Sequence, residues 1–459
     1  MVTHPLSPLS PDESALVEES LRRAGQDHVL AAMAGVPVAE RVRRLTPLAG
    51  VPVERLASLV RAEVKAHPLD PARIAAPPWV ALGKHDAGAR ERGEELLRDG
   101  KIATLLVAGG LGTRLGWDAP KGTFPIGPVT DRTLFQHFAE THRALGRRYG
   151  RSIPWAIQTS GTNHAATWEF LQAHGWFGLD PTDVLLFPQG DLPAFDPSGR
   201  ILLDPESHVI AQPDGHGGVF GALERRGALR WLADRGVEHV FYFQVDNPLA
   251  PICDPAFLGH HALSGSRMST LAVRKVDPAE RVGVLCLRDG APGIVEYSEL
   301  PPEVATARAP DGGLLLRAGN TAIHAFTMEL LAQMAHERDF PVHMARKPIP
   351  TGAASVEGIK LEYFVFDALP YAGTTLIMEL DRATGFAPVK NADGADSPAT
   401  ARAAMSAKWR RWVERWDPRT VMLPEDTLVE VSPLVALDAD ELRSHPIPEA
   451  PPTSPLILR

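Results

Sequence analysis

The sequence predicts an α/β protein built on a doubly wound sheet, with a helical region before the sheet and a small β-rich cap after it. From residue 102 onward, short apolar runs alternate with amphipathic segments. The apolar runs are nearly continuous, which is typical of strands buried on both faces of a parallel sheet. The chain of 459 residues also exceeds what one small core needs, so we expect two or three domains.

The N-terminal region, residues 1–95, is predicted to be helical. Ser10 can cap a helix, Pro11 suits its first position, and Glu13 stands three residues after the cap. Helical spacing of apolar residues continues to about His67, where a proline-rich connector begins. We therefore expect helices that pack on the part of the chain that follows.

The central region, residues 96–416, is predicted to hold the sheet. The expected strands are 102–108, 155–159, 184–187, 240–245 and 270–276. The expected helices lie near 134–145, 162–174, 221–235, 327–338 and 398–416. Strand, helix and strand in repetition indicate a sheet with helices on both faces. The expected strands 282–287, 294–297, 314–317 and 320–326 have no helices between them, and they predict an antiparallel insertion.

The last region, residues 417–459, is predicted to form a small β-rich domain. Its strand signals are at 420–423 and 428–431. The three regions together give the expected domain organisation of the chain.

Composition and charge exclude several classes of function. The formal net charge is -9, from 47 basic and 56 acidic residues, which gives no electrostatic reason to expect nucleic acid or an anionic membrane as a partner. No window approaches the roughly 18 apolar residues of a membrane span, and the N-terminus lacks the pattern of a signal peptide. The two cysteines, Cys253 and Cys286, lie beside apolar segments. They are expected to be buried, inert thiols in a reducing compartment, which favours the cytoplasm.

The most informative stretch is a glycine-rich turn after the first expected strand. An apolar run leads into Gly109, Gly110 and Gly112, and Arg114 and Lys121 follow within a dozen residues. Glycines at a strand end let backbone N–H groups approach a charged or planar ligand closely. The carboxyl ends of the strands are where ligands bind in sheets of this kind. The stretch therefore predicts a site for a phosphorylated ligand.

The same glycines allow three other interpretations. A P-loop needs its lysine after the second glycine, but Lys121 comes before Gly122, so this interpretation fails. A dinucleotide fingerprint needs a third glycine where Leu115 stands, so this interpretation is weak. An ordinary tight turn would explain a glycine pair alone, but it explains the following cations poorly.

Several segments carry a resemblance to a known family. They are AGQDH (24–28), LLVAGGLGTRLGWDAPKGTFPI (105–126), QG (189–190), PDGHGG (213–218), QVDNPL (244–249), VEYSEL (295–300), AGNTAIHAF (318–326), EYFVFD (362–367), FAPVKNADG (386–394) and VSPL (431–434). In this order the chain resembles the eukaryotic-type UDP-sugar pyrophosphorylases, and most of all the UDP-N-acetylhexosamine pyrophosphorylases. The resemblance covers nearly the whole chain.

The resemblance implies both a fold and a reaction. The fold is a nucleotidyltransferase domain with a doubly wound mixed sheet, Rossmann-like and GT-A-like, between a helical region and a small β domain. The reaction joins UTP to a hexose or N-acetylhexosamine 1-phosphate and releases pyrophosphate, with Mg²⁺ as cofactor. The alternatives from other classes are a nucleotide-sugar-binding regulatory protein without catalysis and a nicotinamide dehydrogenase.

The resemblance implies roles for the charged residues. Arg114 and Lys121 match cations that hold the triphosphate, and Lys390 matches a lysine that stabilises the transition state at the α-phosphate. Asp246 matches the contact to Mg²⁺, and a carboxylate after a buried strand suits that role. An exposed ion pair is the alternative for Arg114 and for Lys121, and a solvated lysine is the alternative for Lys390. An Asx turn before Pro248 is the alternative for Asp246.

For the uracil base, the resemblance points to residues at the ends of three expected strands or loops. They are Gly109, Gly110, Gly112, Gln189 and Gly215. The Gln189 amide offers both an acceptor and a donor to one edge of the base, while glycine backbone groups read the other. A glutamine in a surface turn is the alternative.

For the sugar, the resemblance points to Glu296 and Asn320, which match residues that bind hexose hydroxyls, with Tyr297 adjacent. Phe364 and Phe366 alternate on a strand-like run and match an apolar wall near the N-acetyl group, although alternating aromatic residues are often only core.

His216 departs from the family pattern, because the N-acetylhexosamine enzymes carry Asn in PDGNGG. Enzymes for UDP-glucose and broader UDP-sugars often carry His there, so His216 leaves the sugar open. N-acetylglucosamine 1-phosphate leads, glucose 1-phosphate follows closely, and galactose forms stay open.

Overall fold

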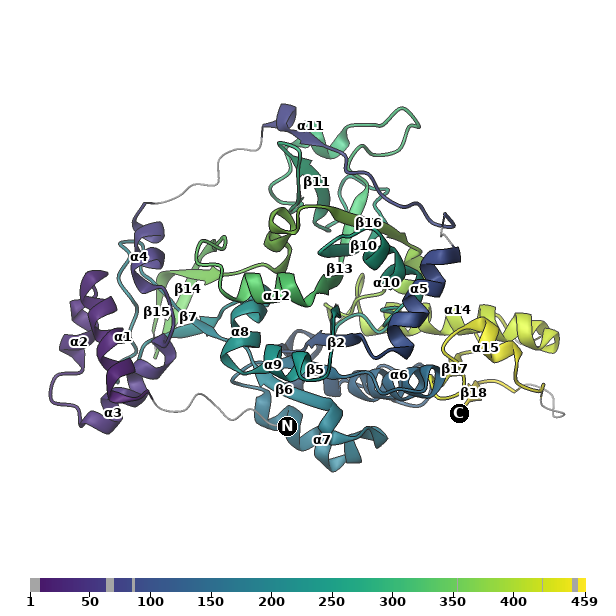
Figure 1. The fold of residues 1–459 in the computed structure, drawn as a ribbon, viewed down its shortest axis with the longest axis horizontal. Coiled ribbons are helices and arrows are strands. Elements are labelled where there is room, and N and C mark those ends of the chain that lie inside the picture. The colour runs from purple at the N-terminus through teal and green to yellow at the C-terminus, as the bar shows by residue number, and fades with distance from the viewer. Residues whose placement is uncertain (1–8, 63–69, 85–86, 353, 423, 448–452) are drawn as a thin grey trace.

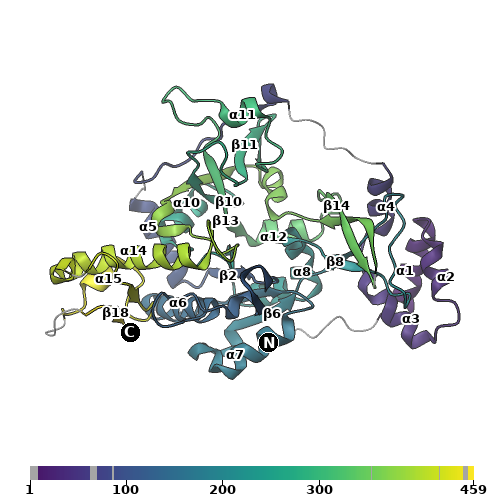
Figure 2. The same ribbon diagram turned by 180° about the vertical axis from the view of Figure 1, so that it is seen from behind.

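The computed structural model describes residues 9–62, 70–84, 87–352, 354–422, 424–447 and 453–459. A central sheet lies between two terminal parts (Figure 1; Figure 2 from behind). The purple N-terminal helices form one end of the molecule, and the yellow C-terminal elements form the other.

The central sheet has ten strands, in the order β1-β11-β13-β9-β2-β5-β6, with β10, β12 and β16 attached off this path. The bounds are β1 Ile74–Ala75, β2 Ile102–Val107, β5 Trp155–Thr159, β6 Val184–Pro188, β9 His239–Gln244, β10 Met268–Arg274, β11 Val284–Arg288, β12 Ala291–Val295, β13 Ala318–Thr327 and β16 Thr375–Leu380. Strands β9, β2, β5 and β6 are parallel neighbours, whereas β13 is antiparallel to β9 and to β10. The sheet is therefore mixed, with a parallel half whose strands all end at one edge.

Helices cover both faces of the parallel half, as the alternation of core residues shows. Leu106, Ile157 and Phe243 belong to one apolar cluster with residues of α6, α10 and α14. Leu105 and Tyr242 belong to a second cluster with residues of α8, α9 and α12. Successive side chains of a strand point to opposite faces, so the two clusters are the two faces of the sheet. The helices are α5 Ala87–Arg98, α6 Leu134–Tyr149, α7 His164–Ala173, α8 Val219–Arg225, α9 Ala228–Ala233, α10 Pro255–Leu263, α11 Pro302–Thr306, α12 Met328–Ala335, α13 Arg382–Gly385 and α14 Pro398–Trp416.

The N-terminal helices form their own small core with one part of the central chain. They are α1 Pro11–Arg23, α2 Asp27–Ala32, α3 Val38–Leu45 and α4 Val53–Arg61, and α1 begins with the expected capping box of Ser10 and Glu13. Their apolar side chains pack against Phe195, Ile201 and Ile359. These residues come from the region of two small sheets, β7 Asp191–Pro193 with β8 Ala211–Pro213 and β14 His343–Thr351 with β15 Ala354–Glu362.

The C-terminal part is a short parallel pair, β17 Val429–Val431 and β18 Leu456–Leu458, with α15 Ala439–Arg443. It is joined to the central part by buried charges. The Arg132 guanidinium lies 2.9 Å from the Glu140 carboxylate and 2.7 Å from the Glu430 carboxylate. Glu430 also accepts hydrogen bonds from the backbone N–H groups of Val129 and Thr130. The loop after the glycine-rich turn is thereby held by a residue about 300 positions later in the chain.

Most expected elements are confirmed, and several details are wrong. The helix expected over 221–235 is divided at Gly227, whose φ of 70° begins a new helix. The strand expected at 314–317 is a single bridge at Leu314. The strand signal at 420–423 is a 3₁₀ turn as far as Met422, and Leu423 lies outside the described residues.

The expected antiparallel pairing is confirmed, and β11, β12 and β13 are strands of the central sheet itself. Phe364 and Phe366 were expected on a strand, which is wrong: β15 ends before them, and Phe366 lies in the 3₁₀ segment η8 Val365–Ala372. The proposed domain limits at 95 and 416 stay predictions. No helix in the described ranges is long and apolar enough to cross a membrane.

Candidate active site

Three of the expected ligand-binding residues follow the ends of parallel strands. Gly109 follows β2, Gln189 follows β6, and Asp246 follows β9. These strands are parallel neighbours with β5 between β2 and β6. The three residues therefore meet at one edge of the sheet, where α/β proteins bind their ligands.

Gly109 lies directly against Gln189. A Cβ atom added at Gly109 would stand 2.8 Å from the Gln189 Oε1 atom, closer than a side chain tolerates. The Gln189 backbone N–H donates to the Thr159 carbonyl at 2.8 Å, which fixes the amide beside the turn. The two residues expected to read opposite edges of one base are thus neighbours.

Asn163, near the start of α7, secures the glycine turn and was missed from the sequence. It is fully buried, and its Nδ2 donates to the carbonyls of Ala108 at 2.9 Å and Gly110 at 3.3 Å. Its Oδ1 accepts the Ser160 N–H at 2.8 Å. An isolated Asn in a helix start gives no signal of this role, which depends on the pairing of β2 with β5.

Lys121 is brought back onto the turn by a small hairpin, β3 Leu111–Gly112 and β4 Trp117–Pro120. The Lys121 backbone N–H donates to the Gly110 carbonyl at 3.1 Å. A Cβ atom at Gly112 would stand 2.8 Å from Trp117, so this position requires glycine for packing. The hairpin explains why a cation eleven residues after Gly110 lies beside it.

The expected phosphate-binding charges are close enough to act on one another. Burial lowers the pKa of the half-buried Lys121 ammonium, Asp246 raises it, and Lys390 and Arg114 lower it further. Charges of one sign gathered in this way favour binding of a polyanion, which relieves their mutual repulsion. Arg114, Lys121, Asp246 and Lys390, expected from widely separated motifs, are therefore one cluster.

Asp246 and Lys390 are joined through the backbone. The Val389 N–H donates to the Asp246 carbonyl at 2.8 Å. Buried Asn247, a second residue missed from the sequence, accepts from the Ala387 N–H at 3.1 Å and donates to the Gly385 carbonyl at 2.9 Å. The segment that carries Lys390 is thus tied to the end of β9.

An Asx turn was the alternative role for Asp246, but the next residue, Asn247, forms that turn. The Leu249 N–H donates to the Asn247 Oδ1 at 3.2 Å. Among the described residues, no donor or cation is bonded to the Asp246 carboxylate. A half-buried carboxylate with free oxygens beside a phosphate-binding cluster fits a Mg²⁺ ion that takes its other ligands from substrate and water.

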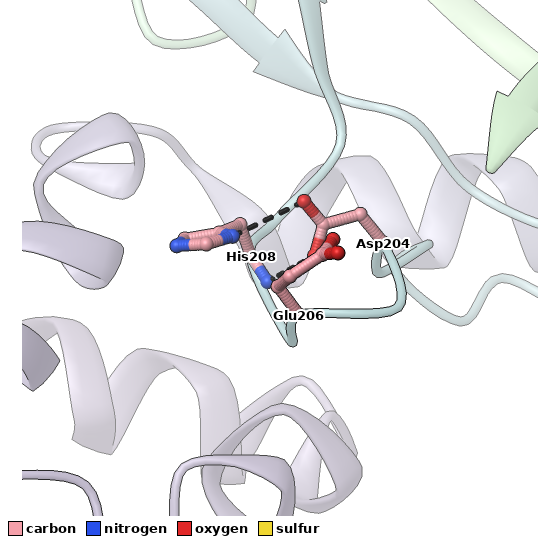
Figure 3. Close-up of side chains that lie close together, drawn as sticks. All are labelled: Asp204, Glu206 and His208. Carbon is pink, nitrogen blue, oxygen red and sulfur yellow. Dashed lines mark hydrogen bonds and ion pairs between the residues drawn. The ribbon is translucent and has the colours of Figure 1, made fainter. Parts of the chain in front are cut away.

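Within the described ranges, one group of two carboxylates and an imidazole could hold a metal ion. It does not supply a second protein ligand beside Asp246. That trio is Asp204, Glu206 and His208 (Figure 3). It lies on a turn beside the N-terminal helices, where the His208 N–H and ring bond to Asp204 at 2.7 and 3.1 Å. Arg44 donates to the Glu206 carbonyl at 2.5 Å, so a cation already adjoins the turn. The trio closes a tight turn and is separate from Asp246.

The two expected hydroxyl-binding residues lie on either side of Gly283. A Cβ atom at Gly283 would stand 3.1 Å from the Glu296 Oε1, and the Asn320 N–H donates to the Gly283 carbonyl at 2.8 Å. Asn320 stands at a bulge in β13, next to Ala322 with φ 56°. A bulge re-aims a side chain out of the sheet. The adjacent Tyr297 is exposed.

Glu296 is the point at which the hydroxyl-binding residues meet the phosphate cluster. Burial and Glu299 raise the pKa of its carboxyl, whereas His343 and Lys390 lower it. Lys390 therefore acts on both Lys121 and Glu296. The residues expected to bind the triphosphate and Glu296, expected to bind the sugar, thus lie within electrostatic range of the same lysine.

Gly215 and His216 lie against the segment that follows β15. Gly215 has φ 82°, and an added Cβ atom would stand 2.5 Å from the Tyr363 carbonyl oxygen, so only glycine fits. The His216 Nδ1 accepts the Val365 N–H at 3.0 Å. Burial, followed by the charge of His343, lowers the pKa of His216 to about 4, so the ring is neutral near pH 7.

Phe364 and Phe366 are arranged around His216. Phe364 stacks on the His216 ring with centroids 5.2 Å apart and planes at 10°, and Phe366 lies 5.6 Å from it. The His343 ring covers Phe364 at 4.0 Å and 24°. Two imidazole rings, those of His216 and His343, thus stack on Phe364.

A cavity of about 640 Å³ adjoins this site and shares Gln189 with it. Gln189 and Gly190 line one side of it, and Arg55, Asp214 and Tyr363 line others. The charges of the phosphate cluster are absent from its lining. The charged residues at the strand ends, rather than the lining of this cavity, therefore form the candidate active site.

Comparison with known proteins fits this geometry. Residues 55–445 match the family described as UTP–glucose-1-phosphate uridylyltransferase. The chain belongs to this family. The similar proteins carry the names of UDP-N-acetylhexosamine and UDP-N-acetylglucosamine pyrophosphorylases, so the family expected from the motifs is confirmed.

This uridylyltransferase family member is similar to the human UDP-N-acetylhexosamine pyrophosphorylase-like protein 1, with 37% identity over 94% of this chain and 94% of the relative. It is 36% identical to the Saccharomyces cerevisiae UDP-N-acetylglucosamine pyrophosphorylase over 76% of this chain and 77% of the relative.

Among solved structures, the uridine diphosphate N-acetylglucosamine pyrophosphorylase from Trypanosoma brucei superposes with a TM-score of 0.84 and 28% identity. The match covers 96% of each chain. The expected fold class, a mixed doubly wound sheet with flanking helical and small β parts, is confirmed. The role of each site residue stays a prediction.

Proposed function

We propose that this protein is a UTP:sugar 1-phosphate uridylyltransferase that forms a UDP-sugar and pyrophosphate, with N-acetylglucosamine 1-phosphate as the preferred substrate. The observation that carries the proposal is the charge cluster of Arg114, Lys121, Asp246 and Lys390 at the strand ends. The cluster lies between a base-reading pair, Gly109 and Gln189, and the hydroxyl-binding Glu296.

The reaction needs positioning and charge stabilisation more than covalent chemistry. An oxygen of the sugar phosphate attacks the α-phosphorus of UTP, the bond from that phosphorus to the β-phosphate oxygen breaks, and pyrophosphate leaves. Arg114 and Lys121 hold the leaving phosphates, and Lys390 neutralises charge at the α-phosphorus. Fixed cations of this kind stabilise the transition state because they need no reorganisation as charge develops.

Magnesium dependence is part of the proposal. Asp246 would hold the ion, and a bound Mg²⁺ would supply charge neutralisation at the phosphates. The free oxygens of this carboxylate support the role.

Preference for uridine rests on size and hydrogen bonding. The Gln189 amide packs against Gly109, and this contact holds the amide in place at one side of the expected base site. A pyrimidine whose polar edge meets the Gln189 amide is favoured over a larger purine.

The choice of sugar rests on relatives and on one departure. The similar proteins named above act, by their names, on UDP-N-acetylhexosamines, whereas His216 replaces the usual asparagine. Glucose 1-phosphate is therefore the second candidate substrate. Two free, buried cysteines support the cytoplasm as the compartment.

The test is a coupled pyrophosphate assay with UTP, Mg²⁺ and the 1-phosphates of glucose, galactose and both N-acetylhexosamines. We expect turnover that is highest with N-acetylglucosamine 1-phosphate and is lowered about 100-fold or more by Asp246→Asn. Asp234→Asn, on the exposed end of α9, is the matched control with unchanged turnover. UTP binding without pyrophosphate release from any sugar would favour the regulatory alternative and refute the enzyme.

A further inference from the structure

One ring that stacks on Phe364, that of His343, is not among the expected site residues. His343, the first residue of β14, stacks on Phe364 with ring centroids 4.0 Å apart, and Phe364 also stacks on His216 at 5.2 Å. An aromatic ring that stacks on two others cannot tilt without losing contact with one of them. His343 and His216 together therefore set the position of Phe364.

Both imidazoles are tied to the same short segment, η8. The His343 Nε2 lies 2.7 Å from the Asp367 Oδ2, and the His216 Nδ1 accepts the Val365 N–H at 3.0 Å. Val365 and Asp367 flank the second aromatic residue of the stack, Phe366. The rings of His343, Phe364 and His216 thus form one unit with η8.

The His216 ring presents a single free donor. Because the Nδ1 of the neutral His216 ring accepts a hydrogen bond, its proton is on Nε2. Within the described part of the chain, no residue accepts a hydrogen bond from this Nε2. The Nε2–H group is therefore available to a ligand.

The His343 ring also lies near the hydroxyl-binding residues. His343 influences the pKa of Glu296 and that of His216, which come from different elements. It therefore stands at the sugar end of the site rather than at the triphosphate end.

We infer that His343 and Asp367 are positioning residues for the sugar 1-phosphate. Acting through Phe364, they hold His216 so that its Nε2–H donates to an oxygen of that substrate. The inference rests on the proposed function, and it adds two residues that decide how tightly the sugar, rather than UTP, is bound.

The test measures KM separately for UTP and for N-acetylglucosamine 1-phosphate in the full-length protein with Mg²⁺. We expect His343→Gln to raise the KM for the sugar phosphate about fivefold, because the stacking face is lost, while the KM for UTP stays within about twofold. Asp367→Ala should raise the same KM about threefold. His343→Phe restores the ring and should recover most of the loss.

His208→Gln is the matched control, because it removes another His–Asp pair from the remote turn (Figure 3). It should leave both KM values unchanged. A wild-type protein that releases no pyrophosphate would refute the proposed function. An active wild type, with an unchanged sugar KM in Asp367→Ala or with both KM values raised equally, overturns the positioning role alone. If His343→Gln fails to fold, Asp367→Ala and His343→Phe decide the matter.

Discussion

At the scale of single residues, the close contact between Gly109 and Gln189 makes a direct prediction about UTP. An alanine at position 109 would place its Cβ atom 2.8 Å from the Gln189 Oε1 and push the amide away from the base. Losing one such hydrogen bond should raise the Kd for UTP about tenfold. Isothermal titration calorimetry with UTP and Mg²⁺ measures the change.

Gly161 provides the control for this substitution. It follows β5 at the same sheet edge, and a Cβ atom there would meet nothing within 4 Å. Gly161→Ala should bind UTP as the wild type does. Equal affinity of the Gly109→Ala variant would remove Gln189 from the base site.

The lowered pKa of Lys121 predicts a change of activity at alkaline pH. Lys121 must be protonated to hold phosphate, and burial makes it lose its proton at a lower pH than an ordinary lysine. As the pH rises, the kcat/KM of the wild type for UTP should therefore begin to decline before pH ~10.4, the usual lysine pKa, is reached. Lys121→Arg keeps its charge throughout that range.

We expect Lys121→Arg to be slower at pH 7.5, because guanidinium and ammonium differ in geometry, but to show no such alkaline decline. Kinetics from pH 7 to about 10 give both profiles. The same decline in both proteins would mean that another group titrates.

At the scale of elements, the contact between β17 and the loop after the glycine turn stabilises the fold. Glu430 is fully buried and is paired with Arg132. Replacing it by Gln leaves Arg132 with Glu140 alone and weakens the backbone bonds of the loop. The free energy of unfolding should fall by about 3 kcal/mol, the usual cost of breaking a buried pair.

Urea denaturation measures this loss. Asp289→Asn removes an ion pair with Arg73 at an exposed turn, and it should change the midpoint far less. Equal effects of the two substitutions would show that the buried network does not hold the C-terminal part in place.

The strands of the parallel half could be predicted from the sequence because burial on both faces makes them continuous apolar runs. The segment 155–159 is confirmed to the residue. The helix expected over 221–235 was wrong at Gly227 because apolar spacing continues across the break. The alternation of Phe364 and Phe366 indicated a strand. Phe364 is instead held by stacking on two histidines that are distant from it in the sequence.

The candidate site could be predicted only in part, for a related reason. Charged residues in motifs, such as Lys121 and Asp246, are visible in the sequence, and the structure brings them together. Asn163, Asn247 and His343 act on backbone or rings from other parts of the chain. Their contribution depends on how distant strands pair, which local patterns do not contain.

At the scale of the whole molecule, buried histidines make the fold sensitive to acid. Burial is the main cause that lowers the pKa of His142 and His216 to about 4 and that of His137, His261 and His324 to about 3. Below pH ~6.5 the unfolded chain binds protons that the folded chain does not. Stability should therefore fall as the pH drops from about 6.5 toward 4, although buried Asp214, whose pKa is raised, acts in the opposite direction.

His142→Gln isolates one of these groups. Each such histidine contributes about 1.4 kcal/mol per pH unit to the slope of unfolding free energy against pH. Urea denaturation at pH 6 and pH 5 should show a slope lower by about that amount in the variant. Identical slopes would mean that His142 titrates alike in the folded and unfolded chains.

The central claim is that the strand-end charges hold UTP and a sugar phosphate so that the sugar phosphate attacks the α-phosphorus. The most direct measurement uses N-acetylglucosamine 1-phosphate labelled with ¹⁸O in its phosphoryl oxygens, followed by mass spectrometry of both products. All of the label should appear in the UDP-sugar and none in the pyrophosphate. Label in the pyrophosphate, or no labelled UDP-sugar at all, would contradict the claim.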